Sequence, residues 1–225
     1  MPDLSAEEEL AKLKRRQQRN MRHAHAKGLM QGILSMLKPG EIVLDCGANI
    51  GDVTGPLAAT GAAVHAYEPD PYAFGRLRRA FADTPNVTLH NAAVGVSSGT
   101  IKLMRAENFE ANPKGASVKS TVMVGGRRID EHPDNTIDVN LVDLPALARD
   151  LIDEHGEIAF LKMDIEGAEL EVLEIMLEQR LFDNIRLTVA ETHEKKFRDL
   201  APRFKALRTK VAESYPPTQV NLDWI

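Results

Sequence analysis

The sequence is poor in several features that define other classes of protein. A single cysteine, Cys46, in 225 residues excludes an intrachain disulfide. Aspartate and glutamate outnumber lysine and arginine, 33 to 28, so no general basic surface for nucleic acid is indicated. No apolar run approaches the roughly 20 residues that cross a bilayer, and the N-terminus lacks the pattern of a signal peptide. We therefore expect a cytoplasmic protein with no nucleic-acid partner and no transmembrane segment.

Short apolar runs alternate with helical patterns from residue 41 onward. Runs of this length between helices are typical of buried strands in a parallel sheet that carries helices on both faces. The fold class is therefore predicted to be α/β, doubly wound and mostly parallel. The predicted strands are Glu41–Cys46, Ala63–Glu68, Asn86–His90, Glu157–Asp164 and Ile185–Glu191.

Two regions depart from this alternation. Residues 1–40 are predicted to form a helical extension before the domain at 41–225, with seven lysines and arginines between residues 12 and 27. We interpret these basic residues as a solvated helix face. The alternative is a docking surface for an acidic substrate, a partner or a membrane. The same helix is also a candidate for the interface of a homodimer. Residues 99–141 are interpreted as an insertion on the substrate side of the sheet, or as an ordinary extra hairpin.

The run DCGANIG (45–51) has the form of a ligand-binding turn between a strand and a helix. Its glycines let the backbone approach a ligand closely, and the helix N-terminus supplies free N–H groups. A dinucleotide-binding fingerprint would place glycines at positions 47, 49 and 52. The sequence has Gly47, Asn49 and Asp52 there, and its second glycine is Gly51. The spacing therefore argues against a dinucleotide.

Two carboxylates beside this turn indicate a different ligand. Asp45 would repel a pyrophosphate, but it can pair with the cationic amino group of a methionine moiety. Glu68 ends the next strand, where a carboxylate can accept hydrogen bonds from both ribose hydroxyls. Asn91-Ala92 either meets the adenine edge or is a simple turn. We therefore predict an S-adenosylmethionine site formed by Asp45, Gly47, Asn49, Gly51, Glu68, Pro69, Asn91, Ala92 and Asp164.

Four segments resemble the FkbM family of methyltransferases: VLDCGANIGDVT (43–54), AYEPDP (66–71), NVTLHNAAVG (86–95) and FLKMDIEGAELEVLE (160–174). The resemblance covers roughly residues 41 to 193, and the string DIEGAE is its specific part. It implies a class I methyltransferase fold, Rossmann-like, with a seven-stranded sheet. It also implies methyl transfer, usually to a hydroxyl oxygen of a sugar or secondary metabolite, so a small hydroxylated acceptor is expected.

The candidate catalytic residues are Asp164, Glu166, Glu191 and His193, which follow two neighbouring strands. His193 is the most natural general base because its unperturbed pKa lies near neutrality, unless it is a surface histidine. Asp164 is a second candidate base, an acceptor-orienting group, or a helix N-cap. A divalent metal held by Asp164, Glu191 and His193 is a further possibility, ranked below the histidine base.

Two other functions compete with O-methyl transfer. An N-methyltransferase acting on adenine or cytosine would carry an Asn/Asp-Pro-Pro-Tyr motif where this chain has Asp-Ile-Glu-Gly (164–167), and aromatics for base stacking are only 5% of the residues. A non-catalytic adaptor would bind the cofactor or a partner without turnover, which the intact loop and carboxylates argue against.

Overall fold

The computed structural model of the protein describes residues 6–105, 109, 117, 120–123, 132, 135–194 and 196–224. The chain divides into two compact units. The first contains helix α1 (Ala6–Met36), which confirms the predicted N-terminal helix, and the second spans Leu37–Trp224. Three glutamates occupy the first turn of α1, where acidic side chains favour the helix dipole. Within the described ranges, no helix is both long and apolar enough to cross a bilayer.

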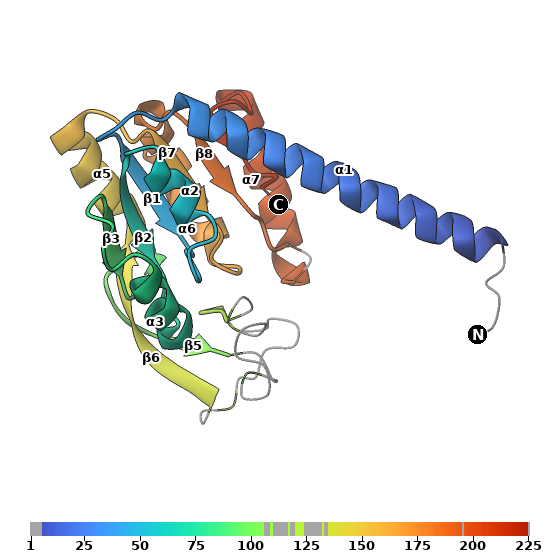
Figure 1. The fold of residues 1–225 in the computed structure, drawn as a ribbon, viewed down its shortest axis with the longest axis horizontal. Coiled ribbons are helices and arrows are strands. Elements are labelled where there is room, and N and C mark those ends of the chain that lie inside the picture. The colour runs from blue at the N-terminus through green and yellow to red at the C-terminus, as the bar shows by residue number, and fades with distance from the viewer. Residues whose placement is uncertain are drawn as a thin grey trace. The chain divides into compact units, whose positions relative to one another are not determined.

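The second unit is built on a six-stranded sheet with the order β3-β2-β1-β7-β8-β9 (Figure 1). All five neighbouring pairs are parallel. Every residue of β1 is buried, as a central strand with helices on both faces requires. The sheet confirms the predicted parallel arrangement. Its strands are β1 (Ile42–Cys46), β2 (Ala63–Tyr67), β3 (Val87–His90), β7 (Phe160–Met163), β8 (Thr188–Ala190) and β9 (Val220–Asn221).

Helices pack against both faces of this sheet. One core cluster joins α5 (Leu144–His155), α6 (Glu169–Glu178) and α7 (Ala201–Ser214) to the sheet and includes Tyr67. A second cluster joins Leu77 of α3 (Pro71–Ala80) to Ala66. Ala66 and Tyr67 are neighbours in β2, and consecutive strand residues point to opposite faces of a sheet. The two clusters therefore lie on opposite faces. The doubly wound prediction is confirmed; the short helix α2 (Thr54–Ala59) follows the glycine loop.

The central sheet has six strands, close to the expected seven, and a separate three-stranded sheet is also present. This second sheet has the order β4-β6-β5 and comprises β4 (Ala92–Gly95), β5 (Gly99–Met104) and β6 (Thr136–Asp143). The chain leaves the central sheet at Asn91, whose side-chain amide donates to the carbonyls of Glu68 (2.8 Å) and Pro69 (3.1 Å). This turn directs β4 to pair with β6, in parallel, instead of extending the central sheet.

The two ends of the predicted insertion at 99–141 form strands of this second sheet. β5 and β6 form the antiparallel pair that the hairpin alternative predicts. The segment 117–124, where the sequence also predicts a short strand, lies partly outside the described residues. Its described part includes Thr121, which makes an antiparallel bridge with Met104 through two backbone hydrogen bonds of 2.8 and 2.9 Å.

Candidate active site

A cavity of about 390 Å³ lies at the carboxyl ends of β1, β2 and β7, which is the binding edge of a doubly wound sheet. The glycine loop and the end of β2 form one part of its wall, and apolar residues of β4 form another. Residues of the insertion, including Thr121 and Val122, close a further side. Three carboxylates complete the wall: Asp164, Glu166 and Glu191. The described part of the insertion therefore contributes to the cavity.

The glycine loop reaches the cavity because two of its positions have no room for a side chain. Gly47 has a φ of +82°, and a Cβ there would lie 1.8 Å from the carbonyl oxygen of Asp164. Gly51 has a φ of +98°, and its Cβ would meet the ring of Phe81 at 2.3 Å. Gly47 and Asn49 line the cavity, whereas Gly51 serves the packing of the loop on α3.

Glu68 is placed where the sequence predicts a cofactor carboxylate. It lines the cavity with only 5% of its surface exposed, together with Pro69 and Ala92. Its Oε2 accepts a hydrogen bond from the backbone N–H of Asn49 (2.9 Å), and its Oε1 accepts one from Asp70 (2.8 Å). Burial raises the pKa of Glu68 to about 7 despite these two donors. A ligand that donates to the ionised form would therefore bind better above neutral pH.

Asp45 is paired with a residue that the sequence analysis did not single out, Lys162. Its carboxylate is fully buried: Oδ2 accepts a hydrogen bond from Thr54 Oγ1 (2.7 Å), and Oδ1 lies 3.4 Å from the ammonium of Lys162. Burial alone would lower the pKa of Lys162, but Asp45 and Asp164 raise it above its usual value. A buried carboxylate needs such a pairing. Asp45 is not among the residues that line the cavity, and its contact with a methionine amino group stays a prediction.

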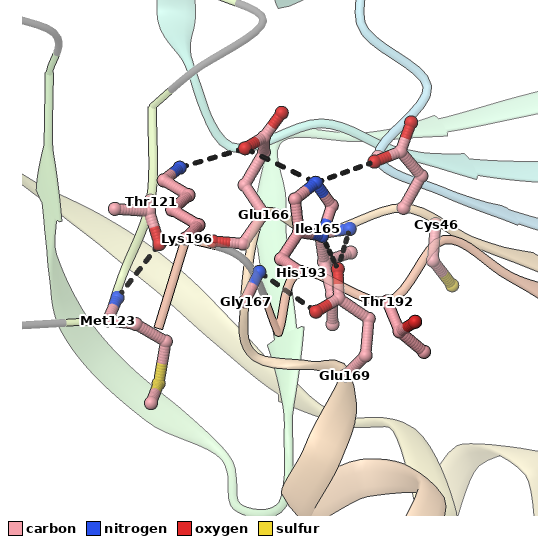
Figure 2. A network of polar contacts seen from close by, with 12 residues as sticks. Cys46, Thr121, Met123, Ile165, Glu166, Gly167, Glu169, Thr192, His193 and Lys196 are labelled. Carbon is pink, nitrogen blue, oxygen red and sulfur yellow. Dashed lines mark hydrogen bonds and ion pairs between the residues drawn. The ribbon is translucent and has the colours of Figure 1, made fainter. Parts of the chain in front are cut away.

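The string DIEGAE forms a tight loop between β7 and α6. Glu166 has a left-handed φ of +58°, and Gly167 has a φ of +118° with its missing Cβ only 2.1 Å from the ring of Phe197. Glu169, the first residue of α6, is fully buried and accepts hydrogen bonds from the backbone N–H groups of Ile165 (2.8 Å) and Gly167 (2.9 Å) (Figure 2). The second glutamate of the string therefore holds the loop in shape.

Glu169 also orients His193 (Figure 2). The Nδ1 atom of His193 lies 3.1 Å from Glu169 Oε1, while Nε2 lies 3.5 Å from Glu166 Oε2 and 4.0 Å from Asp164 Oδ1. Burial alone would lower the pKa of His193, but Glu169, Glu166 and Asp164 raise it to about 9. The imidazole is therefore mostly protonated at neutral pH, unlike the unperturbed side chain assumed from the sequence.

Two of the cavity carboxylates, Glu166 and Glu191, have different surroundings. Glu166 pairs with Lys196 Nζ at 2.8 Å, and its carbonyl accepts a hydrogen bond from Thr121 Oγ1 at 2.7 Å (Figure 2). Burial, followed by the nearby charge of Asp164, raises the pKa of Glu191. Among the described residues, the wall includes these carboxylates but not His193.

The structure brings together the three residues of the predicted metal alternative. Asp164, Glu191 and His193 each offer one ligand atom, and these atoms lie within 4.8 Å of one another.

Cys46 is fully buried, and burial raises the pKa of its thiol, so it is a packing residue and not a nucleophile.

Comparison with known proteins identifies the family of the second unit. The methyltransferase FkbM domain matches residues 45–214. The chain belongs to the FkbM methyltransferase family. This confirms the resemblance seen in the sequence, and α1 lies outside the matched range.

Individual relatives of this FkbM-family protein vary in similarity. It is 29% identical over 181 residues to the 31-O-demethyl-FK506 methyltransferase FkbM of Streptomyces tacrolimicus, covering 70% of this chain and 67% of that protein. A solved rRNA methylase of Streptococcus thermophilus shares 10% identity over 84% of this chain and 78% of its own, with a TM-score of 0.42. A further solved structure is the 1,6-didemethyltoxoflavin-N1-methyltransferase of Burkholderia thailandensis, with 1,6-didemethyltoxoflavin and S-adenosylhomocysteine bound. It shares 16% sequence identity over 69% of this chain and 81% of its own, with a TM-score of 0.21.

Proposed function

We propose that this FkbM-family protein transfers the methyl group of S-adenosylmethionine to a hydroxyl oxygen of a small-molecule acceptor. The observation that carries the proposal is one cavity whose wall contains both Glu68 with the glycine loop and the carboxylates Asp164, Glu166 and Glu191. The name of the Streptomyces tacrolimicus relative, a 31-O-demethyl-FK506 methyltransferase, adds support for oxygen as the acceptor atom.

The cavity residues fit the cofactor. The absent Cβ of Gly47 lets the loop backbone pack against the carbonyl of Asp164 at the edge of the cavity. Glu68 retains lone pairs for two ribose hydroxyls beyond its two backbone donors. Apolar side chains of β4 and Leu103 suit the face of an adenine. When bound, S-adenosylmethionine supplies an already activated methyl group, so the protein has to orient the acceptor, exclude water and remove one proton.

We infer that a cavity carboxylate removes this proton, with Glu191 the first candidate. Glu191 lines the cavity, and its raised pKa brings it closer to the range suited to a general base at neutral pH. His193 lies behind the carboxylates, and its cation balances part of their charge. Asp164 and Glu166 are then placed to orient the acceptor hydroxyl.

A metal-assisted variant of the same reaction is the second candidate, favoured by the clustering of Asp164, Glu191 and His193. A divalent cation there would lower the pKa of an acceptor hydroxyl. It would also require His193 to lose its proton, because only the neutral imidazole is a ligand. Treatment with EDTA separates the two: loss of activity that Mg²⁺ or Mn²⁺ restores supports the metal, and unchanged activity excludes it.

The experiment that tests the proposed function combines binding with product analysis. Calorimetry should show that the full chain binds S-adenosylhomocysteine, and a panel of hydroxylated acceptors incubated with S-adenosylmethionine should yield a product that is heavier by one methyl group. Absence of cofactor binding would overturn the proposal. Binding without turnover on the panel would favour the adaptor, and a product methylated on nitrogen would favour the N-methyltransferase.

A further inference from the structure

A buried lysine lies directly behind the cavity wall. Lys162 of β7 has 2% of its surface exposed. Its Nζ donates hydrogen bonds to the carbonyls of Gly47 (2.7 Å) and Cys46 (3.3 Å). The same ammonium lies 3.4 Å from Asp45 Oδ1 and 3.8 Å from Asp164 Oδ2. One side chain therefore contacts the glycine loop, the strand before it and a cavity carboxylate.

These contacts join two parts of the cavity that come from distant segments of the sequence. Asp45 and Lys162 are partners in the register of β1 and β7, so the pair is fixed by the sheet itself. Gly47 and Asp164 both line the cavity, one on the side of the cofactor loop and one among the carboxylates. Lys162 donates a hydrogen bond to the carbonyl of Gly47 and pairs with the carboxylate of Asp164. Thr54 Oγ1 donates to Oδ2 of Asp45, the carboxylate oxygen that is not next to Lys162.

Stability alone does not account for this pair. Removing two charges from water is unfavourable, and well-packed apolar residues in place of a buried ion pair are often as stable or more stable. An apolar side chain could not donate to the carbonyl of Gly47 or hold the Asp164 carboxylate. What the lysine adds is therefore the orientation of the loop and of that carboxylate.

We propose that Lys162 is a positioning residue for cofactor binding, with Asp45 as its counterion. It holds the carbonyl of Gly47 and the carboxylate of Asp164 where the cofactor requires them, and Asp45 acts through Lys162 instead of contacting the cofactor. This inference rests on the proposed function, since it assumes that the cavity binds S-adenosylmethionine.

A set of variants separates positioning from a purely structural role. Lys162→Met leaves the buried Asp45 carboxylate without its cation, and Asp45→Asn leaves Lys162 with the more distant Asp164 carboxylate as its remaining acidic partner. Both variants should lower the thermal midpoint, whereas the double variant removes both charges and should recover it. S-adenosylhomocysteine affinity, measured by calorimetry, should stay about 10- to 100-fold weaker in Lys162→Met and in the double variant. In the Lys162→Met background, Asp45→Asn should cause no further loss.

A second variant covers the case in which the double variant does not fold. Thr54→Val keeps both charges but removes the hydroxyl that holds Asp45, and it should weaken S-adenosylhomocysteine binding by about 3- to 10-fold with little loss of thermal stability. The matched control is Glu41→Gln with Arg186→Met, which neutralises an ion pair of the same domain away from the cavity lining. It should leave the affinity unchanged.

Three results would overturn the inference. Recovery of affinity together with thermal stability in the double variant would make the pair structural only. An equal loss from Asp45→Asn in the wild-type and Lys162→Met backgrounds would make Asp45 a direct ligand. Unchanged affinity in Thr54→Val would contradict the network if the double variant is unfolded. Failure of the wild-type protein to bind S-adenosylhomocysteine is a different result, because it rejects the proposed function itself.

Discussion

Replacing Glu169 by glutamine should disconnect the DIEGAE loop from His193. The carboxylate is fully buried and accepts from Ile165 N–H at 2.8 Å, from Gly167 N–H at 2.9 Å and from His193 Nδ1 at 3.1 Å. A glutamine oxygen can keep one of the backbone donors, but its amide group then faces the other. A hydrogen bond to a charged group contributes about 1.5–3 kcal/mol, so we expect a loss of about 2–4 kcal/mol in the free energy of unfolding.

The same substitution should change the titration of His193. Its folded pKa of about 9 lies above its ordinary value of 6.5, so the pairing contributes stability that is complete below pH 6.5 and is lost as the pH rises through 9. The difference corresponds to about 3 kcal/mol. Without the charge of Glu169, which gives the largest upward contribution, the pKa of His193 should fall towards 6.5.

Two measurements check this prediction on the same protein. Denaturant unfolding at pH 6 and pH 9 should show that the wild type loses stability between these values and that Glu169→Gln loses less. NMR titration of the His193 imidazole gives the pKa directly. A His193 that still titrates near pH 9 in Glu169→Gln would refute the reasoning, because the pKa would then depend on other groups.

Three further predictions concern cofactor binding, chemistry and the loop. S-adenosylhomocysteine affinity should fall about tenfold per pH unit below pH 7, because Glu68 must ionise to accept hydrogen bonds from two ribose hydroxyls. Calorimetry should find that this pH dependence is absent in Glu68→Gln. A wild-type affinity that does not change with pH would contradict the prediction. Glu191→Gln should lower kcat by about 10²- to 10⁴-fold without changing S-adenosylhomocysteine affinity; if His193→Gln has the larger effect in steady-state kinetics, the proton acceptor is His193. Gly167→Ala should destabilise the protein by about 2–4 kcal/mol in denaturant unfolding, because the new Cβ would overlap the ring of Phe197 and because the backbone φ of +118° is unfavourable for alanine. A variant as stable as the wild type would contradict this prediction and show that the loop can shift.

Much of the fold could be predicted from the sequence because its strands are short, apolar and separated by helices. The carboxyl ends of parallel strands meet at one edge, so Glu68, Asp164 and Glu191 were predicted to lie near one another, and all three line one cavity. The separate pairing of β4 with β6 was not predicted, because it follows a turn at Asn91 that residue types alone do not reveal.

The buried contacts of Asp45 and His193 were harder to predict than the residues that line the cavity. A carboxylate before a glycine turn looks the same in the sequence whether it faces a ligand or a buried lysine. The signal that could have identified the partner of Asp45 is Lys162 itself, a charged residue inside the otherwise apolar strand FLKM. The pKa of His193 depends on three carboxylates of the DIEGAE string, which the fold brings next to the imidazole and which residue types alone do not reveal.

A crystal structure of the full chain with S-adenosylhomocysteine bound tests the central claim most directly. The account predicts that the ribose hydroxyls donate to Glu68, that the sulfur lies beside Asp164, Glu166 and Glu191, and that Asp45 remains paired with Lys162. A ligand bound outside this cavity, or an amino group bonded directly to Asp45, would contradict it.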